Sequence, residues 1–134
     1  MKINRMAILL ADDHPGSAEV LADLLQMNLP VETLCVFDGQ AAVNAAPSFR
    51  PGLAILDIDM PLLNGVDAAL SIRELMPGVV CMAVTGRTSL AEVRAAGAFD
   101  VVFQKPLDID LFVEVVRLVV DGNPAAMQVA EVPA

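Results

Sequence analysis

Residues 6–15, MAILLADDHP, set the expectation for the fold. The apolar residues Met6 to Ala11 run directly into Asp12 and Asp13. An uninterrupted apolar run of this length is typical of a parallel strand that is buried on both faces. Similar runs recur at Val31 to Phe37, Leu53 to Leu56, Val79 to Val84, and Val101 to Phe103. The sequence therefore predicts five buried strands.

Segments with helical spacing follow each of these runs. The first has an apolar stripe made of Val20, Leu21, Leu24 and Leu25, and the last has another over 111–119. The three helices between them are predicted at 40–46, from Asn64 or Val66 to Met76, and from a capping box at Ser89 and Glu92 to Gly97. Strict alternation of strand and helix predicts an α/β fold, a parallel sheet with helices on both faces.

Length and composition exclude several classes of protein. The chain has 134 residues, which fits one domain, and 56% of them are hydrophobic, too many for a disordered chain. The net charge of −9 argues against a nucleic-acid-binding face and against docking on an anionic membrane. No apolar stretch approaches the ~18 residues of a membrane span, so a cytoplasmic location is expected. Cys35 and Cys81 lie in apolar runs and are expected to be buried hydrophobes.

The predicted domain covers residues 5–121. Beyond Asp121 the helical period is lost, and Pro124 and Pro133 interrupt the chain. Residues 122–134 are therefore predicted to form a flexible tail or a linker stub. The chain is either a single-domain protein or a piece of a longer one, and both readings stay open.

Polar residues stand where the predicted strands end. Asp12 and Asp13 follow the first strand, Asp57 the third, Thr85 the fourth and Lys105 the fifth. In an open parallel sheet the carboxyl ends of the strands share one edge, so these side chains are expected to converge there. Like charges raise one another's pKa, and a hard divalent cation such as Mg²⁺ would relieve the conflict among three carboxylates.

The remaining two groups favour phosphoryl chemistry. Lys105 is one of only two lysines in the chain and stands between an apolar strand and Pro106. A cation, an ammonium group and a hydroxyl group together suit a phosphoryl group, whose transfer depends on positioning and charge neutralisation. An aspartate can be the covalent acceptor and form an acyl phosphate.

Four motifs carry a family resemblance, namely ILLADDHP, LDIDMPLLNG, AVTG and QKP. In this order they resemble the receiver domain of bacterial response regulators, and the resemblance spans Met6 to Asp121. It implies a doubly wound, flavodoxin-like sheet of five strands in the order 2-1-3-4-5. It further implies two-component or phosphorelay signalling: a histidine kinase or histidine phosphotransfer protein as donor, a downstream protein target and, as an option, a homodimer. Such a domain is a switch that dephosphorylates itself slowly, without an external substrate.

The resemblance also assigns roles to individual residues. Asp57 would be the phosphoacceptor and would also belong to the metal site. Asp13 would bind Mg²⁺ directly, Asp12 through water, and Asp59 through its backbone carbonyl. Lys105 would pair with the phosphoryl oxygens, and Thr85 would move to hydrogen-bond one of them. Gly86 would be the small residue beside the phosphate. The Lys105–Pro106 bond is often cis in this family.

Three positions depart from the family pattern. Val102 stands where the family usually has the aromatic switch residue, and Phe103 beside it should point to the opposite face of the strand. The fourth helix is expected to be about one turn short. The third departure concerns Asp59 and Arg87, which occupy positions that tune dephosphorylation, and we hypothesise that they pair across the mouth of the pocket.

Two other functions compete with the receiver interpretation. The residues Asp57-Ile58-Asp59 also match the paired aspartates of haloacid-dehalogenase-like phosphatases, although that motif usually lies on the first strand. Alternatively, the receiver fold is kept as a binding scaffold in which phosphorylation is uncoupled from any switch, a reading that Val102 and the short fourth helix keep open. His14 is interpreted as a loop residue near the site.

Overall fold

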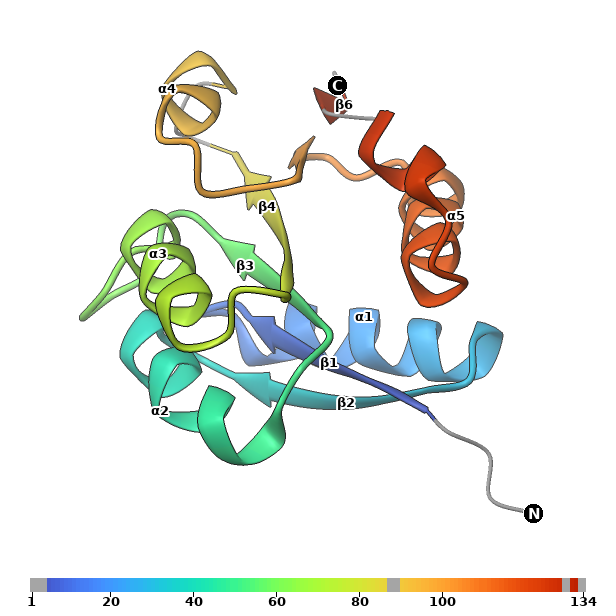
Figure 1. Ribbon diagram of the computed structural model, residues 1–134, viewed down its shortest axis with the longest axis horizontal. Helices are drawn as coiled ribbons and strands as arrows, with labels where there is room; N and C mark the ends of the chain where they lie inside the picture. Colours follow the sequence, from blue (N-terminus) through green and yellow to red (C-terminus); the bar gives the residue numbers. More distant parts are fainter. Residues whose placement is uncertain (1–4, 87–89, 129–130, 133–134) are drawn as a thin grey trace.

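The computed structural model describes residues 5–86, 90–128 and 131–132, and it contains one parallel sheet (Figure 1). The strands are β1 (Met6–Ala11), β2 (Val31–Val36), β3 (Leu53–Asp57), β4 (Val80–Thr85), β5 (Val101–Gln104) and β6 (Glu131–Val132). Their spatial order is β2-β1-β3-β4-β5-β6, and each neighbouring pair is parallel. The predicted order 2-1-3-4-5 is confirmed, and β6 extends it at one edge.

Helices cover both faces of the sheet, as predicted. They are α1 (Pro15–Asn28), α2 (Gly39–Phe49), α3 (Gly65–Leu75), α4 (Leu90–Ala95) and α5 (Ile109–Val120), followed by the short 3-10 helix η1 (Pro124–Gln128). Residues of α1 and α5 pack with Ile8 and Leu10 of β1, whereas α2 and α3 pack with Leu9 and Ala11 (Figure 1). Successive β1 side chains therefore enter opposite cores, which is why the run is apolar throughout.

One helix ends where the sequence did not predict. Helix α2 was expected to stop at Ala46 but continues through Pro47 to Phe49, and the N–H of Arg50 closes it on the carbonyl of Ala46. A proline lacks the N–H of one helical bond but keeps a helical φ, so a last turn can contain it. Helix α4 has six residues, which agrees with the expected shortening. Ser89 of the predicted capping box lies outside the described residues.

The chain beyond α5 is more regular than predicted. Gly122 has a φ of +69°, which reverses the chain, and the side chain of Asn123 accepts the N–H of Ala125 to start η1. Ala126 is fully buried in the core beneath α5, and β6 pairs with Val102 and Phe103 of β5. In its described part, the segment predicted as a flexible tail thus packs on the domain. Short helical turns and two-residue strands have no periodic signature, so the sequence could not reveal them.

Two glycines hold the loop between β3 and α3 against the rest of the domain. A Cβ on Gly39 would collide with the backbone carbonyl of Leu63, and one on Gly65 would collide with the carbonyl of Asp57. The N–H of Gly65 also donates to the carbonyl of Ile58 at 3.0 Å. Close backbone approach therefore requires glycine at both positions, and it fixes the loop that follows Asp57.

None of the helices in the described ranges is long and apolar enough to cross a membrane.

Candidate phosphoacceptor site

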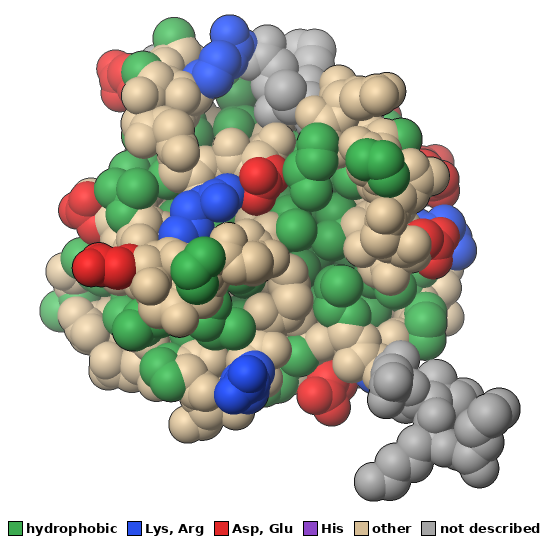
Figure 2. Space-filling model, in the orientation of Figure 1, with side chains coloured by type: hydrophobic (Ala, Val, Ile, Leu, Met, Phe, Trp, Pro, Cys, Tyr) green, Lys and Arg blue, Asp and Glu red, His purple; other side chains and the backbone are tan. Residues whose placement is uncertain are grey.

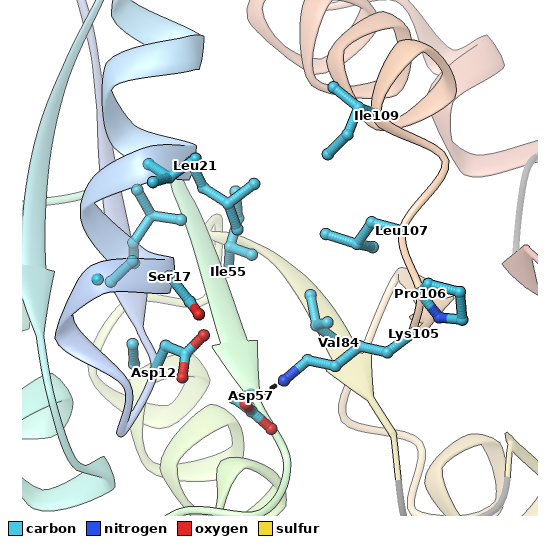
Figure 3. Close-up of a pocket in the computed structure, with 15 residues that line it drawn as sticks. Asp12, Ser17, Leu21, Ile55, Asp57, Val84, Lys105, Pro106, Leu107 and Ile109 are labelled. Atoms are coloured by element: carbon cyan, nitrogen blue, oxygen red, sulfur yellow. Dashed lines mark hydrogen bonds and ion pairs between the residues drawn. The ribbon is translucent and has the colours of Figure 1, made fainter.

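The polar residues predicted at the strand ends do meet at one edge of the sheet. Asp57 is the last residue of β3 and Thr85 the last of β4, while Asp12 and Lys105 directly follow β1 and β5. Asp12, Asp57 and Thr85 are the buried polar residues of the described chain, with exposed fractions of 8%, 5% and 0%. Figure 3 shows Asp12, Asp57 and the Lys105 ammonium pointing into a common space.

Both oxygens of the Asp57 carboxylate have a donor. The Lys105 ammonium lies 2.9 Å from Oδ2, and the N–H of Asp59 donates to Oδ1 at 3.1 Å. The N–H of Lys105 in turn donates to the carbonyl of Thr85 at 2.8 Å, which ties the loop after β5 to β4. The Lys105–Pro106 bond is cis, as the resemblance implied. The carboxylate is thus held in one orientation at the end of β3.

Burial dominates the electrostatics of this pair. It raises the pKa of Asp57 above its ordinary value, although the hydrogen bond and charge of Lys105 oppose it, and the charge of Asp12 raises this pKa further. Burial lowers the pKa of Lys105, but the hydrogen bond and charge of Asp57 outweigh it, so that pKa is raised. The lysine is therefore charged at neutral pH. Its positive charge does not fully offset the cost of burying the Asp57 carboxylate.

A second acidic group lies beside Asp57. Asp12 Oδ1 accepts the N–H of His14 at 2.9 Å, and His14 Nδ1 lies 3.0 Å from Asp13 Oδ1. One ligand atom each of Asp12, Asp13 and His14 lie within 4.8 Å of one another. Among the residues that the structure describes, this group does not include Asp57, whose Oδ2 is paired with Lys105.

The donor set fits a hard divalent cation. Carboxylate oxygens are the ligands that Mg²⁺ prefers, and a cation near Asp12 and Asp13 would supply the positive charge that buried Asp57 lacks. The predicted carbonyl ligand Asp59 follows Asp57 in the fixed loop, but its contact with a cation stays a prediction. Arg87, the hypothesised partner of Asp59, lies outside the described residues.

The two neighbouring residues of β5 face opposite cores, as predicted. Phe103 packs edge-on against Phe112 of α5, with ring centroids 5.3 Å apart at 70°. Val102 lies with Ile58, Ala83 and Val93 on the side of α4. The position where the family usually has its aromatic switch residue, on the α4 side of β5, therefore holds an aliphatic side chain. Among the described residues, a Cβ on Gly86 would meet the Lys105 side chain at 3.5 Å or more, which is ordinary van der Waals contact.

The site opens into an apolar cleft that the sequence analysis missed. The cleft has a volume of about 730 Å³, with Asp12, Asp57 and Lys105 at its polar end. Its walls come from α1, from the loop before α5 and from the first residue of α5, among them Leu21, Leu107 and Ile109 (Figure 3). Val20 of the predicted apolar stripe also lines it and is 66% exposed, so this residue is not in the core. Helical period alone cannot separate a core-facing residue from one at the rim of a cleft.

Comparisons with known proteins identify a family. A family model of the response regulator receiver domain matches residues 8–117. Protein-glutamate methylesterase/protein-glutamine glutaminase 4 of Myxococcus xanthus is 35% identical over 114 residues, covering 80% of this chain and 31% of the relative. Transcriptional regulatory protein DegU of Brevibacillus brevis is 28% identical over 124 residues, covering 90% of this chain and 52% of the relative. The chain thus spans from about a third to about half of these relatives.

Solved structures show the same fold. A CheY-like response regulator receiver domain protein from Methanospirillum hungatei superimposes with a TM-score of 0.81 at 21% identity, covering 89% of this chain and 96% of that one. The receiver domain of the putative response regulator NarL from Mycobacterium tuberculosis gives 0.80 at 22% identity, covering 90% and 100%.

The fold and the site define a signalling domain of two-component systems. The chain belongs to the response regulator receiver domain family.

Proposed function

We propose that this chain accepts a phosphoryl group on Asp57 and converts it into a change of a protein-binding surface. The observation that carries the proposal is the buried Asp57 carboxylate, fixed by the N–H of Asp59 and facing the Lys105 ammonium at 2.9 Å. In this geometry the acceptor, a charge-neutralising lysine and an acidic cation site share one edge of the sheet.

The transfer would proceed by direct displacement at phosphorus. An Asp57 carboxylate oxygen forms the new P–O bond while the P–N bond to a donor imidazole breaks, and the imidazole nitrogen keeps the bonding pair and takes up a proton. Lys105 would follow the phosphoryl oxygens and neutralise their charge. When bound at Asp12 and Asp13, Mg²⁺ would supply further positive charge to those oxygens. Hydrolysis of the acyl phosphate would reset the switch slowly.

The phosphodonor we propose is a histidine kinase or a histidine phosphotransfer protein. The cleft beside Asp57 gives such a partner an apolar surface to bind, because Val20 and Ile109 are 66% and 41% exposed at its rim. A nucleic acid is not the proposed partner. On the face drawn in Figure 2, Lys and Arg side chains stand apart among apolar and acidic ones instead of forming a basic patch. The downstream target is proposed to be a protein.

The switch itself is the finer part of the proposal. Thr85 is fully buried at the end of β4 and would turn toward a phosphoryl oxygen. Val102 packs beneath α4 and would have to transmit that movement without an aromatic ring. This observation favours one second candidate, a receiver that is phosphorylated but whose output does not depend on it. The phosphatase alternative is less favoured, because its motif would lie on the third strand here.

Intact-mass analysis tests the acceptor chemistry. The full chain and Asp57→Asn are incubated with acetyl phosphate, with and without Mg²⁺, and followed over time. A Mg²⁺-dependent adduct of one phosphoryl group on the wild type alone is expected. A folded wild-type chain that gains no adduct would contradict the proposal, and rapid donor turnover without an adduct would favour the phosphatase.

The same time course tests the tuning position. Asp59→Asn changes one side chain next to the acceptor without touching Asp57, Lys105 or the acidic pair. We expect the lifetime of the phosphoryl group to change, since the family resemblance gives Asp59 a position that tunes dephosphorylation. An unchanged lifetime would remove Asp59 from the proposal and leave the acceptor role of Asp57 intact.

A further inference from the structure

His14 is the only histidine among the 134 residues, and its side chain is turned toward the acidic pair. It occupies the N-cap of α1, where side chains such as Ser, Thr, Asp and Asn normally accept a helix N–H. The His14 side chain makes no such bond. Its Nδ1 atom lies instead 3.0 Å from Asp13 Oδ1 and 3.6 Å from Asp12 Oδ1. Helix capping therefore does not account for the imidazole at this position.

The spacing of these atoms suits a shared cation. Adjacent ligands of an octahedral ion at about 2.1 Å are about 3 Å apart. The distance from His14 Nδ1 to Asp13 Oδ1 matches that separation, and all three donor atoms fall within 4.8 Å of one another. The backbone supports the arrangement, because the N–H of His14 donates to Asp12 Oδ1 and fixes the loop between the two residues. The imidazole is 74% exposed, so a metal ion can reach it directly from solvent.

We propose that His14 Nδ1 is an additional protein ligand of the cation site at Asp12 and Asp13, and that it shifts the preference of this site from Mg²⁺ toward Co²⁺ and Zn²⁺. The inference rests on the proposed function, since the same carboxylates would hold the cation that assists phosphorylation. Mg²⁺ favours oxygen ligands and gains little from an imidazole. Later first-row divalent ions bind imidazole nitrogen well, so one nitrogen donor discriminates between the two classes of metal.

The competing explanation is a hydrogen bond alone. A protonated imidazole beside two carboxylates would give the same short distance without any role in metal binding. The two explanations differ in one measurable property. An ion-pairing histidine changes the affinity for all divalent cations in the same direction, because it acts through charge. A ligand changes the affinity for nitrogen-preferring metals far more than the affinity for Mg²⁺.

Isothermal titration calorimetry on the untagged full chain separates them. Mg²⁺, Co²⁺ and Zn²⁺ are titrated into the wild type, His14→Ala and His14→Asn. His14→Asn removes the imidazole but supplies a favoured N-cap residue, so it guards against a loss that comes from fraying of α1. Glu19→Gln, an exposed carboxylate on the same helix, is the control for a general change of local charge. In both His14 variants we expect the Co²⁺ and Zn²⁺ affinities to fall by about tenfold or more and the Mg²⁺ affinity by about twofold or less.

Spectroscopy gives a second readout that does not depend on phosphorylation. Because the chain holds one histidine, ¹⁵N-histidine labelling yields a single set of ring signals, and Zn²⁺ ligation at Nδ1 would shift that nitrogen selectively. If Mg²⁺ and Co²⁺ bind the wild type and neither affinity responds to His14 substitution, the inference fails and the proposed function stands. Changes of the same sign and size for all metals would also overturn it in favour of the ion pair. If no divalent cation binds the folded wild type, the cation-assisted step of the proposed function fails as well.

Discussion

The two faces of the sheet are built from side chains of different size. On the α1 and α5 face, large residues fill the core, among them Leu25, Met82, Phe103 and Phe112. On the α2 and α3 face, much of the core is alanine: Ala11, Ala42, Ala46, Ala54, Ala68, Ala69 and Ala98. Small side chains let α2 and α3 approach each other and the sheet closely.

This difference explains where the site is open. The cleft beside Asp57 is floored by Leu10, Ile55 and Val84, which belong to the face with large side chains. On the other face, the loop after Asp57 is pressed against Gly39, where no side chain fits. One face therefore gives a partner access to the phosphoacceptor, and the other fixes its position. The surface for docking and the support for the phosphoacceptor therefore lie on opposite faces of the sheet.

The largest expected effect is a loss of stability from a substitution on the face with large side chains. Phe103→Ala should lower the free energy of unfolding by about 3–5 kcal/mol, because the ring is 1% exposed and leaves a cavity against Phe112. Val102→Ala, one residue earlier on the other face, should cost about 2 kcal/mol. Urea unfolding of both variants measures the difference. Equal losses would show that the two faces of β5 contribute alike.

Adding volume on the α4 side should also destabilise. Val102→Phe restores the family's usual aromatic position, but Val102 is 4% exposed and packed against Ala83 and Val93. We expect a loss of about 1–3 kcal/mol from overpacking, with phosphorylation by acetyl phosphate retained. Phe103→Leu, which changes the volume in the other core, is the control. A variant as stable as the wild type would mean that the short α4 leaves room for a ring.

A smaller effect concerns the buried charge at the cleft. Burial raises the folded-state pKa of Asp57, so the unfolded chain loses this proton first as the pH rises. The free energy of unfolding therefore falls as the pH rises from the ordinary pKa of an aspartate to the raised pKa of the folded state. Above the folded-state pKa the loss is complete. Asp57→Asn should thus be more stable than the wild type at pH 7, and the advantage should vanish in acid. Urea midpoints at pH 7 and at pH 3.5 test the sign, and a variant destabilised at pH 7 would contradict it.

The smallest expected effect concerns the reactivity of two thiols, one on each face of the sheet. Burial raises the pKa of Cys81, on the alanine-rich face, to about 11. Burial, with the charges of Glu19 and Asp23, also raises the pKa of Cys35, but that side chain is only partly buried, on the opposite face. A disulfide reagent at pH 8 should modify Cys35 slowly and Cys81 only after unfolding. Faster labelling of Cys81 would show that α3 opens more readily than its close packing indicates.

The parts of the molecule that could be predicted are those with a strong local signal. The five main strands are apolar on both faces, and a parallel buried strand leaves no other pattern. Asp12, Asp57, Thr85 and Lys105 could be placed because parallel strands bring their carboxyl ends to one edge. The position of Phe103 opposite Val102 follows from strand alternation alone.

The parts that could not be predicted depend on contacts between distant segments. Ala126 is buried because η1 folds back on α5, and nothing in the residues after Asp121 specifies that return. Val20 fits a core-facing stripe but lies at the rim of a cleft whose other wall comes from residues near 107. The orientation of the His14 ring is likewise a property of the folded loop. Adjacency to Asp12 and Asp13 was the one signal that could have pointed to it.

The short strand β6 also changes how the sheet ends. An outermost strand offers its free N–H and C=O groups to any other chain, and this is a route to aggregation. On the β5 side the chain's own Glu131–Val132 segment takes up that pairing, next to Val102 and Phe103. The six-residue β2 is the outermost strand on the other side, with the exposed Glu32 near its start. Strand β2 is therefore the longer of the two edges open to pairing with another chain, and the charge of Glu32 opposes such pairing.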